Sequence, residues 1–166
     1  METSNPDAAQ LEEALAALRA LPDGAPVVVS ACLLGVPCRY DGQARPSEAV
    51  SEATRRLHVF PVCPEGASGL PVPRPPAEAH PDTGRIILRD GTDVTQAFER
   101  GTSRMLDAAR SSGATVAILK AHSPSCGVGC VYDGTFSGKL RPGDGLLAAA
   151  LRAEGLHLLD ERALES

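Results

Sequence analysis

The sequence predicts a single α/β domain whose mostly parallel, Rossmann-like sheet is covered by helices on both faces. Residues 26–31 and 115–119 are predominantly apolar runs, which is typical of parallel strands buried on both faces. Segments with helical spacing lie between these and other short apolar runs, and such alternation favours parallel strands joined by right-handed crossovers. The 166 residues suit one domain with a sizeable core.

Helical periodicity and end signals predict four helices. The first places Leu11, Leu15 and Leu18 on one face and ends at a Pro-Asp-Gly sequence. Asp93 is expected to cap the third, with Gln96 completing a capping box. The four expected ranges are 7–20, 47–56, 93–111 and 146–153.

Short apolar runs predict the strands, and long segments without periodicity predict loops at their carboxyl ends. The strands are expected at residues 26–31, 57–62, 85–89, 115–119 and 156–159. Proline and glycine are dense over residues 63–84, so no regular element is expected there, and residues 121–145 are expected to form a second long loop. We expect residues 1–24 to be a helical extension of the α/β domain, which spans residues 25–166.

Composition and charge exclude several classes of protein. The formal net charge of −5 argues against a broad basic surface, so no DNA partner is expected. No apolar stretch approaches the ~18 residues of a membrane span, and Met1–Asn5 lacks the basic start of a secretion signal, so we expect no membrane partner and a cytoplasmic location. Thiols are reduced there, so the five cysteines are expected to be ligands, catalytic groups or core residues rather than disulfides.

Three cysteines follow three of the predicted strands, in loops that contain glycine and proline. Cys32 follows the run 27–31, Cys63 follows the strand 57–62, and Cys126 lies in the loop after 115–119. Loops at the carboxyl ends of parallel strands converge on one crevice, so the three thiols could hold an iron–sulfur cluster or a metal ion there. Single cysteines in apolar loops are also common as small buried hydrophobic residues. The spacing of Cys38 and Cys130 from these cysteines matches a zinc site poorly.

Several motifs in the same loops resemble a family of small bacterial proteins whose characterised members are thiouracil desulfidases. The similarity runs in order from about Val27 to Glu161, and the N-terminal helix lies outside it. The motifs occupy residues 30–35, 39–42, 63–65, 69–76, 123–127, 132–138 and 143–145.

The resemblance implies a [4Fe-4S] cluster with three cysteine ligands and one open iron that takes the sulfur of the substrate. The matching ligand positions are Cys32, Cys63 and Cys126, and the matching acid–base positions are Glu65 and Ser123. The implied reaction is a non-redox hydrolysis of the C–S bond of a thiolated pyrimidine, such as 2-thiouracil, to sulfide and the oxo base. A base must take a proton from water, which a carboxylate can do.

The residues leave alternatives open. Glu65 could instead accept hydrogen bonds from nearby amides, and Ser123 could stabilise the turn before Pro124. Arg39, Asp41 and Lys120 are candidates for substrate binding, although an Arg39–Asp41 ion pair and a solvated Lys120 would also be ordinary.

The activity also has rivals. One is desulfidation of 2-thiouridine in tRNA or its fragments, although the acidic balance favours a small thiobase or thionucleoside. The other is a non-catalytic iron–sulfur or zinc protein, in which Cys38 or Cys130 supplies a fourth ligand. The sequence identifies no acceptor for the released sulfide.

Overall fold

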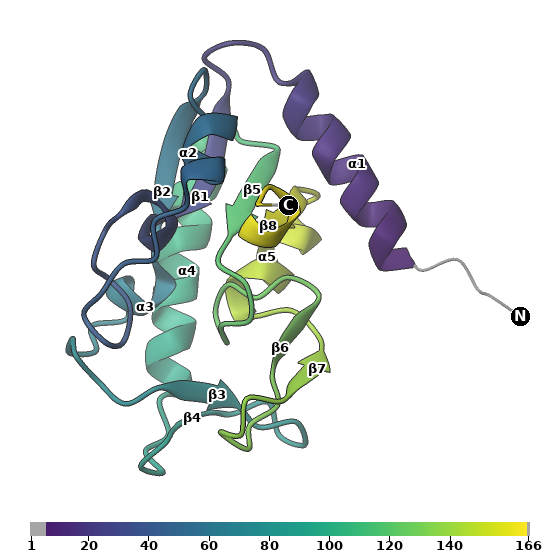
Figure 1. Ribbon diagram of the computed structural model, residues 1–166. Helices are drawn as coiled ribbons and strands as arrows, with labels where there is room; N and C mark the ends of the chain where they lie inside the picture. Colours follow the sequence, from purple (N-terminus) through teal and green to yellow (C-terminus); the bar gives the residue numbers. More distant parts are fainter. Residues whose placement is uncertain (1–5, 166) are drawn as a thin grey trace, which may run out of the picture.

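The structure is a computed structural model that describes residues 6–165, so the N-terminal segment Met1–Asn5 lies outside the described residues. Its centre is a four-stranded, fully parallel sheet in the order β2-β1-β5-β8 (Figure 1). The strands are β1 (Pro26–Ser30), β2 (His58–Val62), β5 (Val116–Leu119) and β8 (His157–Asp160). This confirms the α/β class, and four of the five predicted strands form this sheet. The fifth, expected at residues 85–89, also exists but lies outside the sheet.

Helices cover both faces of the sheet, and the two central strands, β1 and β5, are buried on both sides. Val27 and Val29 of β1 point to a cluster that includes Ala14 and Leu18 of the first helix. Val28 points to the opposite cluster, which includes Ala109 and Leu147 of two later helices. The helices are α1 (Pro6–Ala20), α2 (Glu48–Ala53), α3 (Pro64–Ala67), α4 (Thr95–Ser112) and α5 (Leu146–Ala153), with 3₁₀ turns η1 (Ala31–Leu34) and η2 (Glu161–Ala163). In the described residues no helix is both long and apolar enough to cross a membrane.

Two antiparallel hairpins lie outside the main sheet, at one end of the molecule (Figure 1). The first pairs β3 (Ala77–Ala79) with β4 (Ile86–Leu88), and the second pairs β6 (Cys130–Tyr132) with β7 (Leu140–Pro142). The prediction that residues 63–84 hold no regular element was wrong, since α3 and β3 lie there. The loop predicted over residues 121–145 was wrong as well, since β6 and β7 lie within it. Proline suits the first turn of a helix, where its missing N–H is not needed, and this is how α3 begins.

The start of α4 also differs from the prediction. The helix begins at Thr95, with Val94 at the N-cap and no side-chain cap, so the Asp93–Gln96 capping box is absent. Asp93 is instead held beside β4 by an ion pair with Arg85 and a bridge to Ile87, and it accepts a hydrogen bond from the Thr95 amide at 2.9 Å. These contacts keep Asp93 outside the helix.

Candidate active site

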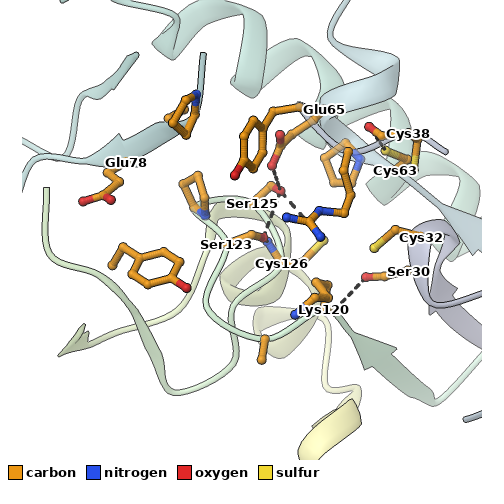
Figure 2. A pocket seen from close by; sticks show the side chains of 18 of the residues that line it. Ser30, Cys32, Cys38, Cys63, Glu65, Glu78, Lys120, Ser123, Ser125 and Cys126 are labelled. Atoms are coloured by element: carbon orange, nitrogen blue, oxygen red, sulfur yellow. Dashed lines mark hydrogen bonds between the residues drawn. The ribbon is translucent and has the colours of Figure 1, made fainter. Parts of the chain in front are cut away.

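A cavity of about 310 Å³ opens at the carboxyl ends of β1, β2 and β5, and Cys32, Cys63 and Cys126 all line it. In Figure 2, Cys32, Cys38 and Cys63 lie on one side, Glu78 lies on the other, and Glu65, Ser123 and Ser125 lie between them. The structure therefore brings together the three thiols that lie about 30 and 60 residues apart in the chain, as parallel strands require.

Local structure fixes each of these thiols. Cys32 lies in the 3₁₀ turn that directly follows β1. Cys63 is the N-cap of α3, and its Sγ accepts a hydrogen bond from the Gly66 amide at 3.2 Å. Cys126 is buried in a turn where its amide donates to Ser123 Oγ at 2.8 Å.

Two glycines allow the backbone of these loops to pack closely on the helices. A Cβ added to Gly101 of α4 would lie 1.9 Å from the Pro64 carbonyl oxygen, so α3 rests directly on α4. A Cβ added to Gly145 would lie 2.5 Å from the Ser125 carbonyl carbon, and the amide of Leu147 in α5 donates to the Ser125 carbonyl at 2.8 Å. The two helices thus position the loops that carry Cys63 and Cys126.

Of the other two cysteines, only Cys38 lines this cavity. Its carbonyl oxygen lies 3.8 Å from Cys63 Sγ. Cys130 belongs to β6 and lines a separate hollow beside Arg162. Cys38 is therefore placed to offer a fourth thiol, and Cys130 is not.

The thiols differ in acidity because their surroundings differ. A hydrogen bond from Cys38 and another from the Gly66 amide lower the pKa of Cys63 to about 7, and Cys38 shifts the opposite way. Burial, with the nearby Cys63, raises the pKa of Cys32 to about 11, and burial raises the pKa of Cys126 to about 12. Without a bound cation, these thiols resist ionising together, and metal ligation reverses that preference.

The donor set suits a cluster better than a single ion. Among residues 6–165, no three His, Cys, Asp or Glu side chains are close enough to hold one metal ion. A single zinc ion requires sulfurs only ~4 Å apart, since each Zn–S bond is about 2.3 Å. A [4Fe-4S] cluster takes its thiolates on different irons and so accepts ligands spaced further apart. The four-cysteine zinc site considered from spacing would need Cys130, which lines a separate hollow.

Glu65 is held at the cavity by two partners that the sequence analysis missed. Arg74 Nη2 lies 2.6 Å from Glu65 Oε1, and the Arg74 side chain is only 2% exposed. Ser125 Oγ donates to Glu65 Oε2 at 3.0 Å. The carboxylate is oriented by the side chains of Arg74 and Ser125. The alternative that Glu65 accepts hydrogen bonds from nearby amides therefore does not match its contacts.

Ser123 lines the cavity and also stabilises its own turn. Its Oγ accepts the Cys126 amide, as the turn alternative predicted, and lies 3.4 Å from Ser125 Oγ. Because the hydroxyl accepts from that amide, its own proton stays free to be donated toward Ser125 or a ligand.

Two of the three candidates for substrate binding line the cavity and the third does not. Arg39 and Lys120 line the cavity, whereas Asp41 does not and lies 3.6 Å from the Arg39 guanidinium as an ion-pair partner. Lys120 Nζ is paired with Glu161 at 2.7 Å, and the Lys120 amide donates to Ser30 Oγ at 2.9 Å (Figure 2). Arg39 Nη1 is buried and has no hydrogen-bond partner in the described residues.

The comparisons with known proteins agree with this geometry. A family model described as 2-thiouracil desulfurase matches residues 27–163. The chain belongs to this family. YbbK of Bacillus subtilis (strain 168), described as an uncharacterized protein, is 38% identical over 146 residues, which cover 83% of this chain and 97% of that protein.

A solved structure of this family has the same fold. The [4Fe-4S]-dependent thiouracil desulfidase TudS superposes with a TM-score of 0.74 at 41% identity, covering 84% of this chain and 93% of that one. The resemblance stated from the sequence motifs and the α/β fold class are both confirmed.

Proposed function

We propose that this member of the 2-thiouracil desulfurase family is an enzyme that hydrolyses the C–S bond of a thiolated pyrimidine such as 2-thiouracil. The observation that carries the proposal is the meeting of three strand-end thiols and an oriented carboxylate in one cavity. Water supplies the oxygen, the products are the oxo base and sulfide, and no electron is gained or lost. The likeness to TudS supports the same chemistry.

Cys32, Cys63 and Cys126 are the proposed ligands of a [4Fe-4S] cluster. When bound through three thiolates, such a cluster would supply an open, Lewis-acidic iron for the thiocarbonyl sulfur. The soft thiolate donors suit iron–sulfur chemistry. Cys38 lies beside Cys63 and is left free in this assignment.

Glu65 is the proposed general base that takes a proton from the attacking water. Arg74 and Ser125 each bind one of its oxygens and so fix the direction of the carboxylate before the substrate arrives. Ser123 is the proposed proton donor, since its hydroxyl proton is not used by the turn. Proton transfer by positioned groups of this kind typically contributes about 10²–10⁴-fold to rate.

Arg39 and Lys120 are the proposed cationic contacts of the cavity. Arg39 Nη1 is buried and has no hydrogen-bond partner among residues 6–165, so its N–H can donate to a carbonyl oxygen of the base. Residues 1–24 are proposed as an extension, since the family model begins at residue 27 although α1 packs on the sheet. A cytoplasmic location belongs to the proposal because thiols remain reduced there.

The test is an anaerobic assay of the reconstituted protein with 2-thiouracil, 2-thiouridine and an RNA fragment that contains 2-thiouridine. Sulfide and the oxo product should appear in equal amounts, with iron and acid-labile sulfide bound to the protein. Full activity of an iron-free protein would contradict the role of the cluster. A bound cluster with no sulfide release from any substrate would indicate a carrier.

A further inference from the structure

Aromatic residues are scarce in this chain, and most of them lie at one cavity. The sequence has three Phe, two Tyr and no Trp. Tyr40, Tyr132 and Phe136 line the cavity, whereas Phe98 and Phe60 pack in or against core clusters. Flat aromatic faces at a ligand cavity are suited to stacking on a planar heterocycle, because every base has a π-face.

Phe136 is held in a backbone conformation that side chains rarely adopt. Its φ is 55°, in the left-handed region. A non-glycine residue keeps such a conformation only where its surroundings enforce it, and such residues cluster at ligand-binding sites. The residue therefore needs a structural restraint.

Glu78 supplies that restraint from β3. Its Oε1 accepts two backbone hydrogen bonds from the β6–β7 loop, from the Gly134 amide at 2.9 Å and from the Phe136 amide at 3.0 Å. The residue is only 8% exposed, and burying a carboxylate is costly unless charged hydrogen bonds compensate for it. These two backbone hydrogen bonds are therefore the contacts that compensate for burying the Glu78 carboxylate.

Close backbone packing completes the restraint. A Cβ added to Gly134 would lie 2.9 Å from the Ala79 carbonyl oxygen, so the loop lies directly on β3. Asp133 Oδ1 also accepts from the Thr135 amide at 2.9 Å, which closes the turn before Phe136. The two hairpins therefore act as one unit in presenting Phe136 to the cavity.

We infer that Tyr132 and Phe136 form the wall that stacks on the pyrimidine ring, and that Glu78 is the positioning residue of this wall. The inference rests on the proposed function and deepens it. Glu78 lies across the cavity from Cys32 and Cys63, with Glu65 between them (Figure 2). A ring whose sulfur points to the cysteines extends its far side toward the hairpins.

The test measures ring binding apart from sulfur chemistry. Binding of uracil, which has the ring and lacks the sulfur, is titrated by NMR on the reconstituted protein, beside KM and kcat for 2-thiouracil. Phe136→Leu should raise the uracil Kd and the KM at least about fivefold, with bound iron unchanged and kcat changed much less. Phe136→Tyr should restore binding, and the matched control Phe60→Leu should bind uracil as the unmodified protein does.

Glu78 is tested by a pair of variants. Glu78→Ala should weaken uracil binding about as much as Phe136→Leu does, whereas Glu78→Gln keeps an acceptor oxygen and should weaken it less. An unchanged uracil Kd in Phe136→Leu would contradict the stacking role of Phe136. An unchanged Kd in Glu78→Ala would contradict the positioning role of Glu78. If the unmodified protein binds uracil but releases no sulfide from 2-thiouracil, the proposed function is contradicted, whereas the inferred stacking on the pyrimidine ring is not. If Glu78→Ala does not fold, Phe136→Leu still tests the stacking role, and Glu78→Gln tests the positioning role.

Discussion

Removal of the Arg74 guanidinium is expected to destabilise the protein by leaving the Glu65 carboxylate without its cation. Deleting one partner of a buried ion pair typically costs about 3–5 kcal/mol. The Glu65 side chain is 17% exposed and keeps its bond from Ser125, so Arg74→Met should cost less, about 2–3 kcal/mol. For a domain of this size that corresponds to a fall in Tm of about 4–12 °C.

A double-mutant cycle separates the ion pair from loss of packing. Unfolding free energies are measured by urea denaturation of metal-free protein for Arg74→Met, Glu65→Gln and the double variant. We expect the Arg74→Met cost to fall by more than about 1 kcal/mol in the Glu65→Gln background, because no charge is then left alone. Arg104→Met is the control: Arg104 contacts the same helix through the Ala67 carbonyl, is exposed and pairs with no carboxylate there. Equal costs of Arg74→Met in both backgrounds would refute the argument.

The other expectations concern the cluster, the base, the thiols and the helix contact. Alanine variants of the three proposed ligand cysteines should each lose bound iron after reconstitution, whereas Cys130→Ala should keep it; the reverse pattern would contradict the assignment. Glu65→Gln should retain iron and substrate binding but lose about 10²–10⁴-fold in kcat, and near-normal turnover would remove it as the base. In metal-free protein Cys63 should be alkylated by iodoacetamide before the other two proposed ligands, since a pKa of about 7 leaves half of the Cys63 thiol as thiolate at pH 7. The rate of Cys63 alkylation should fall as the pH drops below 7, and mass spectrometry identifies the modified cysteine. Gly101→Ala should cost at least about 1–3 kcal/mol in urea denaturation, because its Cβ would overlap the α3 backbone, and a neutral effect would contradict that packing.

Local sequence patterns determined the framework of the fold. The apolar runs that form β1 and β5 are buried on both faces. A strand buried in this way can be recognised from its apolar sequence alone. The strands β3, β6 and β7 were not predicted, because each has three residues in a segment expected to be a loop, too few for a periodicity to be visible. The strand expected at 85–89 exists as β4, but it pairs with β3 and not with the main sheet.

The sequence by itself determined which cysteines would meet, since chain order and parallel pairing place Cys32, Cys63 and Cys126 at the same edge of the sheet. Only the tertiary structure decided what orients Glu65. Its hydrogen-bond partners lie nine and 60 residues away in the chain, and no local pattern encodes a contact between side chains on separate loops. The contact between Glu78 and Phe136 spans 58 residues and has the same origin. Side-chain hydrogen bonds depend on distance and direction in space, and these are set only after the helices and hairpins have packed.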